Sequence, residues 1–260
     1  MRGGVAFLMY HELKSRGRDL CDDDPGYSRY VVTEAEFKRQ LSKIKDNGWT
    51  GWNVTEALSS LSSERDAKGV CITFDDGCAT DLLVAAPILL ELKLQATFYV
   101  TVNHLDRSGY LTRQQLRELS GLGLEIGSHS LNHRHLNDLN LAEVETELGE
   151  SRKALEDITG RIVEHFSCPG GRTSSAIKSI ASKVGYRSVT TSKLGLNTSK
   201  TEKYALTRIA VKEGMSSDTL VRLCEGEGML FGQVQDAALS AVKRFLGNSV
   251  YERVRSAALR

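Results

Sequence analysis

The feature that most constrains the fold of this chain is a regular alternation of short apolar runs with amphipathic segments. Runs of strand length lie at residues 96–102, 124–127, 162–167, 186–191 and 206–211, and segments with helical spacing lie at 82–92, 112–120, 141–158 and 175–184. No proline-rich or low-complexity linker interrupts the series. Such repeated strand–helix units predict an α/β fold whose largely parallel sheet is covered by helices and curls toward a barrel.

The N-terminal part of the chain supplies a further strand and two further helices. Residues 5–10 are apolar and predict a short buried strand, whereas residues 14–32 are polar and predict a long loop. Thr33 followed by Glu36 has the pattern of a helix N-terminus, and a second short helix is predicted at 54–61. One domain accounts for the whole series.

Two adjacent carboxylates follow the apolar run at 69–74. Successive side chains of a strand point to opposite faces, so Asp75 and Asp76 can lie together only where the strand already breaks. Asp-Asp-Gly is an ordinary turn sequence, and a solvated turn is one interpretation. A metal site is the other interpretation, and it requires ligands from elsewhere in the chain.

Two histidines four residues apart follow the run at 124–127. The spacing of His129 and His133 is expected to place both imidazoles on one side of a helical turn, where both can reach one ion. This pattern is weak by itself, so the carboxylate of Asp76 is needed as a third ligand. Two histidines and one carboxylate leave coordination positions open, which is typical of a catalytic site. Asp75 is then available to take a proton from an activated water.

The sequence Thr-Phe-Asp-Asp at 73–76, with His-Ser-x-x-His at 129–133, resembles the first two motifs of the NodB-homology polysaccharide deacetylases, carbohydrate esterase family four. The similarity extends from residue 8 to about residue 211. It implies a distorted (β/α) barrel in which Asp75 is the general base and Asp76, His129 and His133 bind one divalent metal ion. The implied reaction is hydrolysis of an N-acetyl group on an amino sugar of a poly- or oligosaccharide. Zinc is the expected metal, although iron, cobalt, nickel and manganese also suit these ligands.

The third motif of that family ends in Pro-x-Gly, which Pro169, Gly170 and Gly171 match after a predicted strand. The N–H group of Gly170 is therefore the candidate donor to the oxyanion of the tetrahedral intermediate. A plain proline-glycine turn is the alternative. Arg172 follows directly and is a candidate contact for a sugar hydroxyl or an anionic substituent, with a solvated position as the alternative.

The chain departs from the family pattern beside the expected base. Many members carry an arginine that steadies the base, and this chain has Ser167 at that position. Arg208, in the run at 206–211, is a candidate to reach Asp75 instead. A solvated surface arginine is the alternative.

A second departure concerns the general acid. The usual Leu-x-His, whose histidine has that role in the family, has no match at residues 207–215. His11, at a strand end, is a candidate replacement, with a packing role as the alternative. His135 is expected at the surface, and His104 and His165 are expected to be structural. The missing acid and Ser167 favour one rival function, a non-catalytic glycan-binding relative with a degenerate site. A hydrolase of small cyclic amides or imides on a related barrel is a second rival, with the same kind of chemistry.

Composition excludes some classes of partner and points to a compartment. The 34 basic and 33 acidic residues give a net charge of +1, so a nucleic-acid partner is not expected. The five cysteines are scattered and form no Cys-x-x-Cys pair, which favours a reducing compartment. The apolar run near the N-terminus is too short for a signal peptide, and a cytoplasmic location is therefore expected.

The C-terminal segment has a different character. Residues 1–215 are expected to form the deacetylase-like barrel, and residues 216–260 a helical extension packed on it rather than an independent domain. Within this extension, residues 234–260 predict two helices with a modest excess of basic side chains. Peripheral contact with an anionic membrane surface is the functional alternative to packing. The sequence does not predict an oligomeric state.

Overall fold

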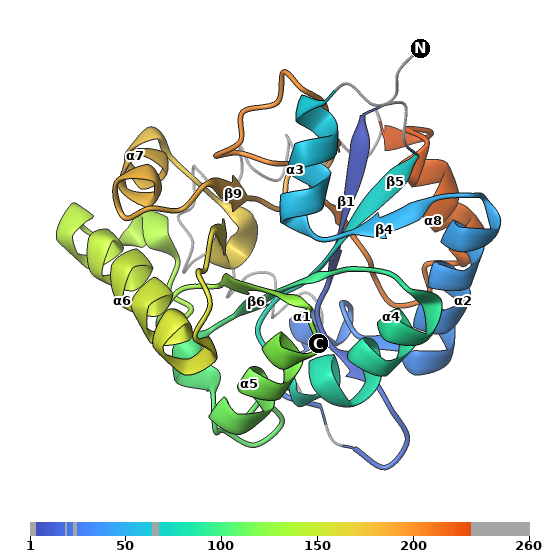
Figure 1. The fold of residues 1–260 in the computed structure, drawn as a ribbon, viewed down its shortest axis with the longest axis horizontal. Helices are drawn as coiled ribbons and strands as arrows, with labels where there is room; N and C mark the ends of the chain where they lie inside the picture. Colours follow the sequence, from blue (N-terminus) through green and yellow to red (C-terminus); the bar gives the residue numbers. More distant parts are fainter. Residues whose placement is uncertain (1–3, 19, 23–24, 64–67, 230–260) are drawn as a thin grey trace.

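A curled, mostly parallel sheet forms the framework of the protein in the computed structural model, which describes residues 4–18, 20–22, 25–63 and 68–229 (Figure 1). Among these residues, seven strands follow one another across the sheet in the order β10-β1-β5-β6-β7-β8-β9. Their bounds are Val5–Tyr10 for β1, Gly69–Phe74 for β5, Thr97–Val100 for β6, Glu125–Ser128 for β7, His165–Ser167 for β8, Ser188–Thr190 for β9 and Leu196–Asn197 for β10.

Strands β1 and β5 are neighbours in the sheet and set the position of the site. They pair in parallel from Ala6 opposite Val70 to Tyr10 opposite Phe74, so both strands end at the same edge. On its other side β5 pairs first with β4 (Thr50–Trp52) and then with β6. All six side chains of β1 are buried, as expected for a strand covered on both faces.

The segment from Leu206 to strand β11 (Ile209–Ala210) links the two sides of the curled sheet. Leu206 pairs with Thr190 of β9, and β11 pairs in parallel with β1. The sheet therefore has the curled form of a distorted barrel, and the predicted α/β barrel fold is confirmed. Arg208 lies in this linking segment, with its side chain almost completely buried.

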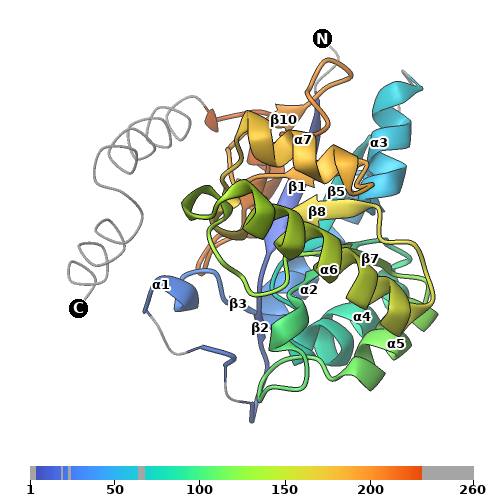
Figure 2. The same cartoon turned by 90° about the vertical axis from the view of Figure 1, so that its left-hand side faces the viewer.

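Helices cover the outside of the sheet (Figure 2). Most of their N-termini carry a side-chain cap: Asn140 of α6, for example, exchanges two hydrogen bonds with Glu143 in a capping box. Their bounds are Pro25–Ser28 for α1, Glu34–Asp46 for α2, Val54–Ser62 for α3, Ala86–Leu92 for α4, Arg113–Gly121 for α5, Leu141–Thr159 for α6, Ser175–Lys183 for α7 and Ser217–Cys224 for α8. A π-helical turn, Asp81–Ala85, precedes α4, and 3-10 turns lie at Val102–His104, Leu136–Asp138 and Pro169–Gly171.

The structure differs from the sequence prediction in several short elements. The predicted loop at 14–32 contains α1 and contributes to a small separate sheet of β2 (Leu13–Lys14) and β3 (Val32–Thr33). The strand predicted at 206–211 contains only two strand residues. Elements of two to four residues carry too few side chains to show a period, so their pairing depends on tertiary contacts.

Helix α8 begins the segment predicted to pack on the barrel. It contacts α2, and Leu220 is completely buried, while Lys43 of α2 pairs with Asp218 at 3.0 Å. The two helices predicted at 234–260 lie outside the described residues, and the proposed boundary at residue 215 stays a prediction. No helix in the described part of the chain is both long enough and apolar enough to span a bilayer.

Candidate active site

The site lies where several parallel strands end at one edge of the sheet. His11 follows β1, the pair Asp75 and Asp76 follows β5, His129 follows β7, and Pro169 lies two residues beyond β8. The Asp75 N–H donates to the Tyr10 carbonyl at 3.0 Å, which continues the β1–β5 pairing up to the site. The C-terminal ends of parallel strands are the usual place for chemistry in such folds.

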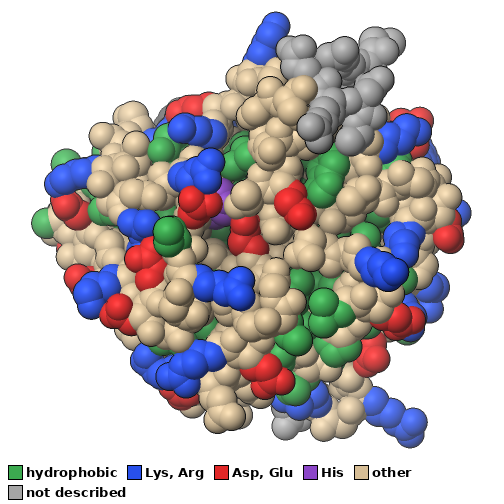
Figure 3. Space-filling model, in the orientation of Figure 1, with side chains coloured by type: hydrophobic (Ala, Val, Ile, Leu, Met, Phe, Trp, Pro, Cys, Tyr) green, Lys and Arg blue, Asp and Glu red, His purple; other side chains and the backbone are tan. Residues whose placement is uncertain are grey.

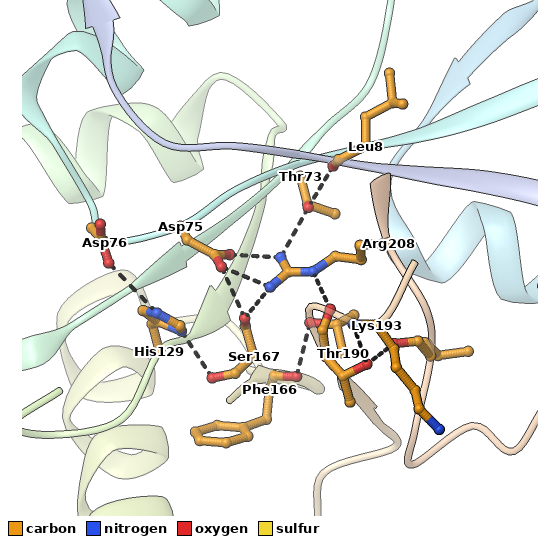
Figure 4. Close-up of polar contacts among 12 residues, drawn as sticks. Leu8, Thr73, Asp75, Asp76, His129, Phe166, Ser167, Thr190, Lys193 and Arg208 are labelled. Carbon is orange, nitrogen blue, oxygen red and sulfur yellow. Dashed lines mark hydrogen bonds and ion pairs between the residues drawn. The ribbon is translucent and has the colours of Figure 1, made fainter. Parts of the chain in front are cut away.

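A sharp bend separates the two neighbouring carboxylates. Asp76 has φ 82° and Gly77 has φ 84°, so the backbone leaves the strand conformation between Asp75 and Gly77. A non-glycine residue at positive φ costs about 1–3 kcal/mol and is typically found at functional sites. The bend directs Asp75 toward Arg208 and Asp76 toward His129 (Figure 4). The two carboxylates therefore have separate surroundings.

Asp76, His129 and His133 form a group suited to a metal ion. The Asp76 Oδ1 atom lies 3.5 Å from His129 Nε2 and 3.4 Å from His133 Nε2. This oxygen is buried and has no hydrogen-bond partner among the described residues, which is costly unless another ligand satisfies it. The three ligand atoms all lie within 4.8 Å of one another. A divalent cation fits this donor set, and two imidazoles with one carboxylate leave positions open.

The surroundings of the group favour ligand-competent protonation states. The Ser167 carbonyl accepts a hydrogen bond from His129 Nδ1 at 2.8 Å, so the lone pair of neutral His129 lies on Nε2, facing Asp76. Burial lowers the pKa of His129 to about 4, which keeps the ring neutral near pH 7. Burial acts to raise the pKa of Asp76, but its contacts with His133 and the nearby His11 hold it far below its ordinary value.

The predicted helical turn between His129 and His133 is wrong. The segment has no helix, because Ser130 and His133 adopt positive φ values of 72° and 58°. Ser130 Oγ accepts a hydrogen bond from the His133 N–H at 2.9 Å and holds the bend. A loop with this shape brings the two rings to a centroid distance of 5.0 Å without helical geometry.

Glu147 of α6 anchors this loop and was not predicted from the sequence. Its Oε2 accepts hydrogen bonds from the Leu131 and Asn132 N–H groups at 3.0 and 2.9 Å, and its Oε1 accepts one from the Asn132 side chain at 2.8 Å. The residue is only 3% exposed although it is a glutamate. Its place beside Val144 and Leu148 on the apolar face of α6 was the signal that could have revealed it.

We expect Glu147→Gln to weaken metal binding about 10–100-fold, as loss of a group that orients metal ligands usually does. The amide carries no charge and brings its own NH₂ group against donors that the carboxylate now satisfies. A competition titration with a chromophoric chelator measures the change. Glu145→Gln, at an exposed position on the same helix, is the matched control and should leave the affinity within a factor of about 2. Equal affinities for the two variants would contradict the anchoring role.

Asp75 is held by a buried bidentate pair with Arg208. The Nη1 and Nη2 atoms of Arg208 donate to Asp75 Oδ1 and Oδ2 at 2.8 and 2.7 Å, and the Arg208 side chain is about 1% exposed. Arg208 Nε donates to the Thr191 carbonyl at 2.9 Å, and Nη1 also donates to Thr73 Oγ1 at 3.2 Å (Figure 4). Of the two interpretations of Arg208, the structure therefore shows the contact with Asp75 and not a solvated position.

Ser167 completes this network at the position where many family members carry an arginine. Its hydroxyl accepts a hydrogen bond from Arg208 Nη2 at 2.9 Å and donates one to Asp75 Oδ2 at 3.2 Å. A guanidinium from the segment before β11 thus approaches the carboxylate across the space that the small serine leaves. Burial is the largest single effect and acts to raise the pKa of Asp75, but the charge of Arg208, the effect of His129 and the hydrogen bonds from Arg208 together outweigh it, so the pKa is lowered.

The Pro169–Gly171 turn lies against His135. Gly170 has φ 66°, and a Cβ atom there would come within 2.6 Å of His135 Cε1. A side chain at Gly171 would overlap Ser192. Both glycines are therefore required by close packing as well as by backbone conformation. The predicted surface position of His135 is wrong, because its ring is half-buried against the turn and its Nδ1 is inaccessible to solvent. Arg172 follows the turn and is half-buried.

Two more histidines lie close to these groups. His11 is half-buried, and its ring lies tilted against that of Tyr30, with the ring centroids 4.9 Å apart. Its Nδ1 is buried without a hydrogen-bond partner in the described part of the chain. His104 was expected to be structural. Its ring centroid lies 4.5 Å from that of Tyr110 and 5.6 Å from that of His133. Burial lowers the pKa of His104 to about 4. It therefore packs beside a candidate metal ligand.

One face of the molecule carries both positively and negatively charged side chains. In Figure 3, acidic and basic side chains are interspersed, and a histidine is visible in a recess between them. This distribution agrees with the balanced net charge of +1. A surface of this kind does not exert the single-sign field that attracts a polyanion.

Comparisons with known proteins match both the motifs and the fold. Residues 62–189 match the family model of polysaccharide deacetylases. The chain is 29% identical over 214 residues to YxkH of Bacillus subtilis, whose name places it among the polysaccharide deacetylases, and the match covers 82% of this chain and 73% of that protein. It is 28% identical over 148 residues to a peptidoglycan-N-acetylglucosamine deacetylase of Bacillus cereus, covering 56% of this chain and 63% of that enzyme, less than two thirds of its length.

A solved structure resembles the whole barrel. The Streptococcus pyogenes deacetylase PplD, determined in complex with acetate, superposes with a TM-score of 0.76 at 26% identity, and the match covers 86% of this chain and 99% of that one. The resemblance first indicated by the motifs at 73–76 and 129–133 is thereby confirmed. Motifs, fold and family-model match together show that this chain resembles the NodB-homology polysaccharide deacetylases.

Proposed function

We propose that this protein is a metal-dependent hydrolase that removes N-acetyl groups from an amino sugar of a poly- or oligosaccharide. The observation that carries the proposal is that two adjacent carboxylates have different partners. Asp76 lies against two imidazoles, whereas Asp75 is held by Arg208. A relative by sequence and a similar solved structure support it by their names, the first as a peptidoglycan-N-acetylglucosamine deacetylase and the second as a deacetylase in complex with acetate.

Asp76, His129 and His133 would hold one divalent cation, with zinc as the proposed ion. Such an ion supplies Lewis acidity toward the amide carbonyl and lowers the pKa of a water molecule. The residues themselves contribute orientation. His129 is fixed through Ser167, and the loop that carries His133 is fixed through Glu147. Both anchors keep the imidazoles in place before substrate binds, which reduces the reorganisation needed during reaction.

Asp75 would take the proton from the attacking water. A carboxylate must be ionised to act as a base, and the lowered pKa of Asp75 ensures this at neutral pH. Arg208 donates one hydrogen bond to each carboxylate oxygen, and Ser167 donates a second one to Oδ2. Oδ1 therefore retains a lone pair that can accept the proton. The paired guanidinium thus fixes the orientation of the base and keeps it charged.

The remaining roles belong to groups around the Pro169–Gly171 turn and the end of β1. The N–H of Gly170 is the proposed donor to the developing oxyanion. Gly170 adopts a positive φ in the turn that follows Ser167, and Ser167 is hydrogen-bonded to Asp75. His11 is the proposed acid for the departing amine, supported by its strand-end position and by an Nδ1 atom that has no hydrogen-bond partner among the described residues. Arg172 is the proposed contact to a substituent of the sugar.

The proposed function predicts acetate release from N-acetylglucosamine oligomers or peptidoglycan fragments by the metal-loaded protein. Removal of the ion with a chelator should abolish turnover, and adding back zinc or another divalent ion should restore it. Small cyclic amides and imides assayed in parallel test the rival function, which is hydrolysis of these compounds. Binding of a glycan with no acetate release in any metal form would instead favour the non-catalytic relative and contradict the proposal.

A further inference from the structure

A second cluster of potential metal ligands lies beside the deacetylase site. Glu12 directly follows His11, Cys78 lies two residues beyond Asp76, and Cys21 comes from the long connection after β2. A carboxylate oxygen of Glu12 and the two sulfur atoms all lie within 4.8 Å of one another. Glu12 is about 1% exposed, Cys78 is completely buried, and Cys21 is half-buried.

The cluster is held together by specific contacts rather than by chance proximity. The Cys21 N–H lies 2.9 and 3.2 Å from the two Glu12 oxygens and donates to the carboxylate. The Tyr27 hydroxyl donates to Glu12 Oε2 at 3.0 Å and lies 3.2 Å from Cys78 Sγ. The Cys21 thiol donates to the Gly109 carbonyl at 2.9 Å. Segments far apart in the sequence therefore converge on this point.

Asp81 is a second, independent observation that points to cation binding in this region. It is about 1% exposed, and neither carboxylate oxygen has a hydrogen-bond partner among the described residues. Its N–H donates to the Cys78 carbonyl at 3.0 Å, so it lies one turn beyond that cysteine. Burial raises its pKa well above the ordinary value, and the next contributions come from Cys21, Asp76 and Glu12.

The charge balance of the cluster is unfavourable without a counter-ion. Neither Glu12 nor Asp81 forms an ion pair with a lysine, arginine or histidine in the part of the chain that the structure describes. Burial of unpaired carboxylates costs several kcal/mol or forces them to bind protons. Metal coordination is one of the two usual ways to retain acidic side chains in a protein interior. Two thiols and a carboxylate are donors that a borderline-soft divalent ion accepts.

We propose that Glu12, Cys21 and Cys78, with the nearby carboxylate of Asp81 as a candidate fourth ligand, bind a zinc-class divalent cation at a site distinct from the Asp76–His129–His133 group. Binding releases the two thiol protons to solvent, and the resulting thiolates become ligands. With Asp81 as the fourth ligand the site would be closed by protein groups, which is typical of a structural ion. It would tie the segment around Cys21 to the end of β5, next to Asp76.

Cobalt substitution of the full-length, reduced protein tests the proposal without an activity assay. Thiolate ligands give Co²⁺ a strong near-ultraviolet charge-transfer absorption that nitrogen and oxygen ligands do not give. The expected result is two equivalents of Co²⁺ per chain and this band. Cys21→Ser or Cys78→Ser should remove the band and one equivalent, whereas His133→Ala should remove one equivalent and keep the band.

Controls separate coordination from general damage to the fold. Cys224→Ser, at a buried cysteine of α8, should keep both the band and the stoichiometry. If Cys78→Ser does not fold, Cys21→Ser at the half-buried position supplies the same measurement. A single equivalent of Co²⁺ with no charge-transfer band in the parent protein would overturn the proposal, as would a band that survives both cysteine substitutions.

Discussion

Asp75→Asn is expected to lower turnover about 10²–10⁴-fold, the usual contribution of a positioned general base, while the metal stays bound. Asparagine has nearly the same shape as aspartate but cannot accept the proton of the attacking water at neutral pH. The metal group is separate, because Asp76 and not Asp75 lies against His129 and His133. Acetate release and metal content measured on the same preparation therefore respond differently to this change.

Asp76→Asn supplies the contrasting variant for this experiment. It removes a charged ligand at a buried position, so metal content and turnover should fall together. In Asp75→Asn the buried Arg208 loses its counter-charge, so a loss of stability of about 3–5 kcal/mol is also expected. Turnover should therefore be assayed at a temperature below the melting temperature of the variant. Turnover within about tenfold of the parent, in a folded and metal-loaded Asp75→Asn, would exclude Asp75 as the base.

The sequence was informative where chemistry and periodicity act locally. Alternating apolar runs predicted the curled α/β sheet, because buried parallel strands and amphipathic helices have distinct periods. Parallel strands end at one edge, so the proximity of the carboxylates after β5 to His129 after β7 followed from their positions in the predicted units. The motifs carried the family assignment because they combine residues from two separate strand ends.

Other parts of the site depend on contacts that no local pattern reveals. The bend at Ser130 and His133 requires positive φ, which neither residue type favours, and it persists because Glu147 accepts hydrogen bonds from the loop backbone. The sequence therefore suggested a helical turn in its place. The contact between Arg208 and Asp75 spans 133 positions of the chain and depends on the small side chain of Ser167 between them. Such pairings are set by tertiary structure.

Arg208→Met is expected to destabilise the protein by about 3–5 kcal/mol, because it leaves the carboxylate of Asp75 buried without its partner. Denaturant unfolding at pH 7 measures the change. Arg187→Met is the matched control, since Arg187 pairs with Glu164 at an exposed position and should cost no more than about 1 kcal/mol. Equal losses in the two variants would contradict the special contribution of the buried pair.

The same substitution should move the acid limb of the activity profile to higher pH. In the parent, the folded-state pKa of Asp75 lies below the unfolded value of about 4, so the stabilisation by the pair is fully present above pH 4 and is lost only as the pH falls through the lower folded-state value. Without Arg208, burial dominates and raises the pKa of Asp75. Asp75 is then protonated over a pH range in which it is ionised in the parent. Within that pH range, kcat/KM of the variant should rise with pH, whereas kcat/KM of the parent stays constant. Arg208→Lys, which keeps the charge but not the bidentate geometry, should fall between the two profiles. An unshifted limb in the folded methionine variant would show that another group controls the ionisation of the base.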